Sequence, residues 1–237
     1  MVFARSAAMA FNRYIDRDID KENERTAACR EIPKGIIQPK SALIFVIVNP
    51  VLIVLTTYWI NDICCYLSPI ALLVTLGYSF TKRFTALCHL VLGVGLSLAP
   101  IGAYLAVTGS FAWLPLHFSF AVLFWVAGFD MIYALQDDEF DKEMGLHSIP
   151  AAIGRKGSLY LSTFFHLLTA IFIVYASFAA EANAIFWTGS ILFIALLFYQ
   201  HLLVKPNDLS KVNLAFFTTN GIASVIFSIF VIVSFYL

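Results

Sequence analysis

The chain has 237 residues, of which 60% are hydrophobic and 13% are charged, and its 15 basic and 15 acidic residues give no net charge. This composition excludes an ordinary soluble domain, in which about a quarter of the residues are charged. The four cysteines form no CxxC pair and no disulfide-like framework, so we assign them packing roles. The zero net charge by itself implies nothing about nucleic acid, because the charges are strongly segregated along the chain, and we expect no nucleic acid partner.

Runs of about 18 to 25 apolar residues recur, and each is long enough to cross a hydrocarbon core of about 30 Å as a helix. Met1 to Phe11 is apolar but too short to cross, and Arg5 makes it a poor signal peptide, so we expect the end of a helix whose beginning is absent. The predicted fold is an all-α polytopic membrane helix bundle with seven full spans. The predicted spans are residues 41–60, 63–80, 87–108, 112–135, 158–179, 183–204 and 212–236.

The distribution of Lys and Arg predicts the orientation of these spans. All 15 fall before the first span or close after the second, fourth and sixth spans. The loops near 61–62, 109–111 and 180–182 carry none, and neither does the C-terminus. By the positive-inside rule the basic loops are cytoplasmic and the C-terminus is outside. Trp residues near the opposite ends of three spans fit an interfacial aromatic belt.

Two acidic clusters adjoin apolar segments on the predicted cytoplasmic side. Each repeats polar side chains at a spacing of four residues, which places them on one face of a helix. Carboxylate oxygens of this kind suit Mg²⁺, which keeps several waters and bridges one or two carboxylates to substrate phosphates. The two stripes consist of Asn12, Asp16 and Asp20, and of Tyr133, Asp137 and Asp141.

A solvated, acidic helix end is the alternative interpretation of either cluster alone. Two clusters in similar settings on one side of the membrane favour the metal site. A calcium-binding EF-hand loop is excluded, because Lys21 and Lys142 stand where such a loop needs Gly, and Ala27 and Ser148 where it needs Glu.

Basic residues complete the predicted site. Tyr78, Lys82 and Arg83 close the second span on the cytoplasmic side. Lys offers a compact charge and Arg a fork that matches phosphate oxygens. Arg25 and Arg30 lie in the polar loop that follows the first acidic cluster, and they are further candidates to contact a diphosphate. Positive-inside anchoring alone also explains Lys82 and Arg83.

Together these residues resemble the UbiA superfamily of intramembrane aromatic prenyltransferases, and the stretch from Thr81 to Tyr104 is most similar to its 4-hydroxybenzoate polyprenyltransferase branch. The resemblance covers essentially the whole chain. It rests on Asn12-x3-Asp16-Arg17-x2-Asp20, on Arg25-Thr26…Arg30-x-Ile32-Pro33, on Tyr78-x3-Lys82 and on Tyr133-x2-Gln136-Asp137-x3-Asp141.

The resemblance implies a Mg²⁺-dependent transfer of a polyprenyl group from its diphosphate to a small aromatic acid, in ubiquinone or menaquinone synthesis. It implies a bacterial inner-membrane enzyme whose active site faces the cytoplasm, with Tyr78, Lys82 and Asp137 as catalytic residues. The implied metal ligands are Asn12, Asp16, Asp20, Asp137 and Asp141. The implied diphosphate-binding residues are Arg17, Arg25, Arg30, Lys82 and Arg83.

Residues 1–237 are expected to form a single transmembrane prenyltransferase domain. Family members usually carry some 40 to 50 residues before the first motif, so the first helix and most of the second are expected to be missing.

An inactive or fragmentary homologue is therefore a second interpretation. A cation-coupled transporter is a third, but its acidic residues would lie near the membrane midplane. A CDP-alcohol phosphotransferase would need an Asp-Gly-x2-Ala-Arg core, which the sequence lacks.

Overall fold

The computed structural model describes residues 2–237, and these contain helices and no β-strand beyond one isolated bridge. Seven helical segments are long and apolar enough to cross a membrane. This confirms the all-α class and the predicted number of spans. The segments contain α4 (Pro39–Ile60), α5 (Asp62–Thr81), α6 (Cys88–Thr108), α7 (Trp113–Ala134), α9 (Ile149–Ala179), α10 (Ala184–Leu203), and the π-helical turn η2 (Leu214–Thr219) with α11 (Asn220–Ser234).

The chain forms two compact units. The first contains the residues up to Phe84 together with Gly102–Phe111. The second contains Thr85–Ile101 and Ala112–Leu237. Helix α6 therefore contributes its first part to the second unit and its last part to the first.

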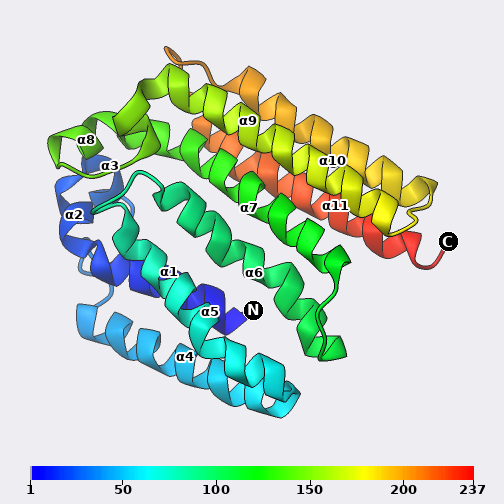
Figure 1. Cartoon of the computed structure of the whole chain (residues 1–237). Helices are drawn as coiled ribbons and strands as arrows, with labels where there is room; N and C mark the ends of the chain where they lie inside the picture. Colours follow the sequence, from blue (N-terminus) through cyan, green and yellow to red (C-terminus); the bar gives the residue numbers. More distant parts are fainter. Residues whose placement is uncertain (1) are drawn as a thin grey trace. The chain divides into compact units, whose positions relative to one another are not determined.

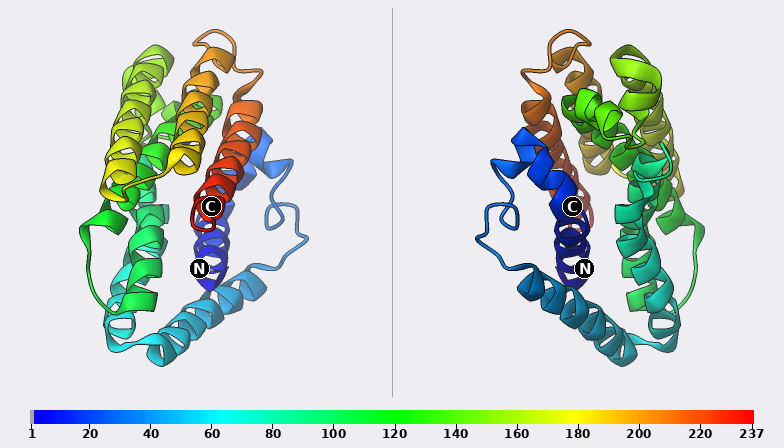
Figure 2. Two further views of the ribbon diagram at one scale, coloured as in Figure 1. Left: turned by 90° about the vertical axis from the view of Figure 1, so that its right-hand side faces the viewer. Right: turned by 90° about the vertical axis from the view of Figure 1, so that its left-hand side faces the viewer.

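In the first unit, α1 (Val2–Ile15) packs against α4 and α5 (Figure 1). Small residues at 7, 8 and 42 are buried there, which lets the helices approach closely. Two short helices, α2 (Arg17–Glu22) and α3 (Glu24–Ala27), follow α1 and lead through a loop to α4 (Figure 2). At the α4–α5 turn, the Asn61 side chain accepts the Cys64 N–H at 2.8 Å and donates to the Leu105 carbonyl at 2.8 Å. Asn61 thus caps α5 and links it by a hydrogen bond to the last turn of α6.

In the second unit, α7 packs on α9, α9 on α10, and α10 on α11 (Figure 1). Three glycines mark close approaches between helices. A Cβ at Gly93 would lie 2.5 Å from the Leu123 carbonyl oxygen, and one at Gly189 would lie 2.4 Å from the Phe230 Cβ. A Cβ at Gly128 would meet the His166 ring at 2.5 Å. Small residues at helix contacts are the usual means of packing in a membrane, where lipid is as apolar as the protein.

The fifth span begins earlier than predicted, at residue 149 instead of 158. Ser148 caps the helix by accepting the Ala151 N–H at 3.3 Å, and Pro150 sits in the first turn, where no N–H is needed. Gly154 then interrupts the helix with a φ of 72°, a conformation that glycine adopts without strain. The segment around Gly154, which lies between the fourth and fifth predicted spans, is therefore a kinked helix start.

We predict that Gly189→Ala destabilises the second unit. The added methyl group meets a Cβ on α11 that has no freedom to rotate away, so we expect a loss of about 1–3 kcal/mol in the free energy of unfolding. Thermal unfolding of the purified protein in detergent measures this change. Gly221→Ala is the matched control, because nothing lies within 4 Å of a Cβ there. Equal stability of the two variants would show that the close approach of α10 to α11 is not required.

Candidate active site

Asp16 lies at the junction of α1 and α2, between Ile15 and Arg17. The backbone still follows the helical pattern there, because the Asp16 N–H donates to the Asn12 carbonyl at 3.0 Å and the Asp20 N–H to the Asp16 carbonyl at 2.7 Å. The Asn12 amide also donates to Asp16 Oδ2 at 3.0 Å. The spacing of four residues thus places Asn12 beside Asp16, as the sequence indicates.

Two cations from the end of α5 reach the same carboxylate. Arg83 Nη2 lies 3.2 Å from Asp16 Oδ1 and donates to the Ile15 carbonyl at 2.8 Å. Lys82 Nζ lies 3.9 Å from Asp16 Oδ2. Asp16 is only 2% exposed, and these two cations compensate its buried charge. The first unit therefore joins the first acidic motif to the basic pair that follows the second span.

Asp20 forms a second buried ion pair, with Arg30. Its carbonyl also accepts the Thr26 hydroxyl at 2.9 Å. Burial raises the pKa of the Asp20 carboxyl, while the charge of Arg30 and its hydrogen bond act in the opposite direction. The loop arginine that was predicted for diphosphate binding is thus paired to a predicted metal ligand.

The remaining predicted residues of the first unit differ in their surroundings. Arg17 donates to the Tyr14 carbonyl at 2.8 Å, and its guanidinium lies over the Tyr14 ring. Arg17 also pairs with Asp18, whose side chain is 81% exposed. Arg25 lies in α3, and its N–H donates to the capping side chain of Asn23. Tyr78 lies on α5 one turn before Lys82.

The second acidic motif lies in the second unit and differs from the prediction. Helix α7 ends at Ala134, a 3₁₀ turn η1 (Leu135–Asp137) follows, and α8 (Asp138–Glu143) begins after it. The stripe of residues 133, 137 and 141 is therefore not carried by one continuous α-helix, because a 3₁₀ turn has about three residues per turn instead of 3.6. Asp141 is buried, and Asp137 is partly buried.

The motif also contains an ion pair that the sequence did not reveal. Asp138 is 4% exposed and accepts two hydrogen bonds from Arg155, at 2.9 and 2.8 Å. This bidentate pair fastens α8 to the start of α9. A second unforeseen pair, His89 and Asp130, joins α6 to α7 with 2.7 Å between His89 Nδ1 and Asp130 Oδ2.

Within residues 2–237, no group of three or more His, Cys, Asp or Glu side chains is placed to hold a metal ion. The first motif instead offers two carboxylates and one amide, and the second offers Asp137 and Asp141. Mg²⁺ typically uses one or two protein carboxylates and fills its remaining positions with water and substrate phosphate. The donor set of each motif therefore fits Mg²⁺ bound together with a diphosphate.

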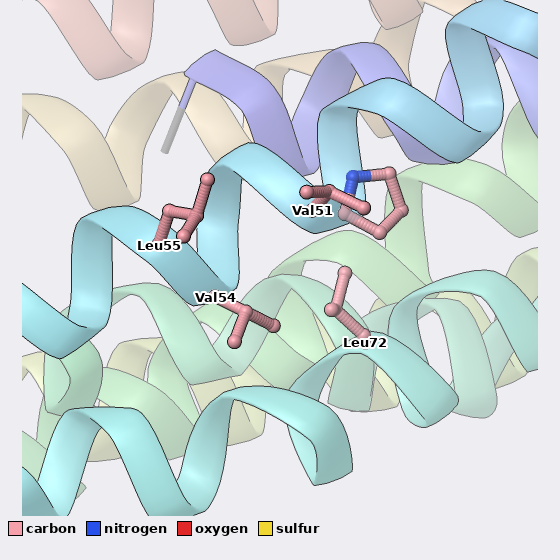
Figure 3. A pocket seen from close by; sticks show the side chains of 5 residues that line it. Val51, Val54, Leu55 and Leu72 are labelled. Atoms are coloured by element: carbon pink, nitrogen blue, oxygen red, sulfur yellow. The ribbon is translucent and has the colours of Figure 1, made fainter.

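Each unit also contains an apolar pocket. In the first, five side chains of α4 and α5 line about 320 Å³, among them Val51, Val54, Leu55 and Leu72 (Figure 3). In the second, a cavity of about 460 Å³ is lined mainly by α7, α9 and α11, with Trp125 and Phe227 among its walls. The predicted catalytic residues line neither of these pockets.

The fold and the charged motifs define an integral membrane protein with seven candidate transmembrane helices. A family model described as the UbiA prenyltransferase family matches residues 1–222. The chain belongs to the UbiA prenyltransferase family. It is 31% identical over 230 residues to a 4-hydroxybenzoate octaprenyltransferase of Aliivibrio fischeri, covering 96% of this chain and 78% of the relative. The enzyme of the same name from Tolumonas auensis is 29% identical, covering 94% and 78%.

Solved structures agree with this assignment. A UbiA homologue from Aeropyrum pernix, determined in the apo form, has a TM-score of 0.90 at 31% identity and covers 98% of this chain and 86% of its own. A UbiA homologue from Archaeoglobus fulgidus bound to DMAPP and Mg²⁺ has a TM-score of 0.65 at 22% identity, with coverage of 95% and 84%. At 22% identity, the similarity to the second structure shows a shared fold and nothing more.

We predict that Arg30→Leu destabilises the first unit, because it leaves the buried carboxylate of Asp20 without its cation. The expected loss at neutral pH is about 3 kcal/mol in the free energy of unfolding. The substitution also removes the influence that lowers the pKa of Asp20, so that pKa rises further. The carboxyl is then neutral in the folded state at low pH, and the deficit grows as the pH rises from about 4, the ordinary carboxyl pKa, to neutral pH.

Thermal unfolding across this pH range measures the effect. Arg17→Leu is the matched control, because its partner Asp18 is exposed and such surface pairs contribute at most about 1 kcal/mol. A deficit in Arg30→Leu that is as small as in the control, or that shrinks as the pH rises, would contradict the assigned ion pair.

Proposed function

We propose that the chain is one prenyltransferase domain that transfers a polyprenyl group from its diphosphate to an aromatic acid, with 4-hydroxybenzoate as the leading acceptor. Three observations support the proposal: the family membership, the two acidic motifs, and the relatives named for this reaction. The product would serve ubiquinone or menaquinone synthesis.

The acidic motifs would hold Mg²⁺ and, with it, the donor diphosphate. Bound Mg²⁺ would neutralise the charge that develops on the leaving diphosphate. The metal ligands in this proposal are Asn12, Asp16, Asp20, Asp137 and Asp141. The diphosphate contacts are Arg17, Arg25, Arg30, Lys82 and Arg83, assisted by Tyr78.

The single observation that carries the mechanism is the environment of Asp16. Lys82 and Arg83 compensate the charge of this buried carboxylate. A divalent cation at Asp16 would take over that role and release both side chains. Their donors would then turn to the phosphate oxygens, for which a compact ammonium and a forked guanidinium are well suited. Metal binding and diphosphate binding are thereby coupled at one residue.

The ring carbon ortho to the hydroxyl group of the acceptor would attack the allylic carbon of the donor, as the bond from that carbon to the diphosphate oxygen breaks and the diphosphate leaves. The ring proton is then lost, and Asp137 would accept it, which restores aromaticity. The isoprenoid chain needs an apolar environment, and the cavity beside Trp125 and Phe227 in the second unit offers one.

We further propose that the basic loops face the cytoplasm of a bacterial inner membrane and that the C-terminus lies outside. The Lys and Arg distribution supports this orientation. The acidic motifs then lie on the cytoplasmic side, where charged acceptors are dissolved.

The enzymatic proposal predicts Mg²⁺-dependent transfer of a radiolabelled prenyl group to 4-hydroxybenzoate in membranes that contain the chain. EDTA should abolish the product and added Mg²⁺ should restore it. Asp16→Ala and Asp137→Ala should each lower the rate at least about 100-fold, because each removes a ligand of the metal that stabilises the leaving group.

Asp18→Asn is the control, since it removes a carboxylate from the same motif at a position where the side chain is 81% exposed. It should transfer the prenyl group at close to the wild-type rate. Product that survives both alanine substitutions would sink the proposed mechanism. No product from the intact chain would favour an inactive homologue.

The proposed orientation is tested by single cysteines in a variant that lacks Cys29, Cys64, Cys65 and Cys88. A membrane-impermeant maleimide applied to intact spheroplasts should label Leu237→Cys. It should label Ser210→Cys, in the loop between α10 and α11, only after the membrane is opened. The reverse pattern would overturn the orientation.

A further inference from the structure

Asp130 stands apart from every other carboxylate in the membrane-spanning helices. Among the described residues, α4 to α7 and α9 to α11 contain only one other Asp or Glu, Asp62, which lies in the first turn of α5. Asp130 lies on α7, four residues before its last residue, Ala134. An ionisable side chain at such a depth is costly, and it is usually retained for a function.

His89 holds this carboxylate from α6. Its Nδ1 lies 2.7 Å from Asp130 Oδ2, and its Nε2 accepts the Ile149 N–H at 3.3 Å. An Nε2 that accepts a hydrogen bond carries no proton, so the proton of the neutral imidazole is on Nδ1 and is donated to Asp130. His89 is 3% exposed, and Ile149, whose N–H it accepts, belongs to a buried apolar cluster with Met131, against which Leu90 packs.

The pair leaves one carboxylate oxygen available. Within the described part of the chain, Asp130 has no hydrogen-bond or ion-pair partner except His89, and 23% of its side chain is exposed. If the pair served only to join α6 to α7, a neutral amide would do so at a smaller desolvation cost. A carboxylate with one fixed and one open oxygen is instead suited to a ligand that donates a hydrogen bond.

We propose that Asp130, positioned by His89, accepts a hydrogen bond from the hydroxyl group of the aromatic acceptor. The inference rests on the proposed function, because it assigns the acceptor a binding group. Asp130 precedes Asp137 by seven residues, four on α7 and three in the 3₁₀ turn η1, which at about 1.5 and 2.0 Å per residue amounts to roughly 12 Å. That separation leaves room for an acceptor ring beside the end of α7. A hydroxyl that donates to a carboxylate also gains electron density, which favours attack from the ring position next to it.

The test compares the binding of 4-hydroxybenzoate, 4-methoxybenzoate and benzoate to the whole protein in nanodiscs by isothermal titration calorimetry. The wild type should bind the hydroxy compound at least about tenfold more tightly than the methoxy compound, which keeps the oxygen but cannot donate. Asp130→Asn should lose this preference while Mg²⁺-dependent prenyl diphosphate binding is unchanged. His89→Gln, which keeps a donor to Asp130, should retain part of the preference, and His89→Leu should lose it.

His117→Gln on α7 is the matched control, because His117 contacts the carbonyl of Trp113 at the other end of that helix. It should leave the preference intact. Equal binding of the three compounds by the wild type, or a preference that survives in folded Asp130→Asn, overturns the proposal. If Asp130→Asn does not fold, the two His89 variants decide in the same way. The binding assay does not require turnover, so a chain that transfers no prenyl group still gives a result.

Discussion

A buried charge in an apolar protein needs a partner of opposite sign, and this constraint organises the charged residues of the chain. Asp16 and Asp20 are 2% and 3% exposed, and each lies within reach of a cation. Asp138 is paired in the same way with Arg155, and the neutral imidazole of His89 donates a hydrogen bond to Asp130. The contacts of Asp16 with Arg83 and of Asp130 with His89 also join segments that are 67 and 41 residues apart in the sequence. The carboxylates that the proposed chemistry needs are thus held in place by the groups that compensate them.

Under the proposed mechanism, the first acidic motif pairs either with basic side chains or with a divalent cation. In the protein alone, Lys82 and Arg83 neutralise Asp16. When a divalent cation and a diphosphate are bound, Lys82 and Arg83 would instead bind the phosphate oxygens. The net charge of the site would change little during this exchange, because the metal brings positive charge and the diphosphate brings negative charge. In the same way, a divalent cation at Asp20 would replace Arg30, which would then bind the diphosphate.

Much of this architecture is encoded locally and was predictable. The seven spans follow from hydropathy, since each crosses the membrane as a helix whatever its neighbours are. The Asn12–Asp16 contact follows from helical spacing alone. By contrast, Asp16 and Arg83 are 67 residues apart, and the Asp138–Arg155 and His89–Asp130 pairs depend on how helices pack. The start of α9 was missed because Gly154 and two basic residues look like a loop in the sequence. The 3₁₀ turn at Asp137 has no local signal that hydropathy reveals.

The central claim is that a divalent cation replaces Lys82 and Arg83 at Asp16. A crystal structure of the protein with Mn²⁺ and an unreactive thio-analogue of a prenyl diphosphate tests it most directly, because Mn²⁺ is located by its anomalous signal. We expect a metal ion within about 2.2 Å of an Asp16 oxygen. We also expect the Arg83 guanidinium to have moved from Asp16 to a phosphate oxygen. A bound diphosphate with the Arg83–Asp16 pair intact and no metal at Asp16 would contradict the account.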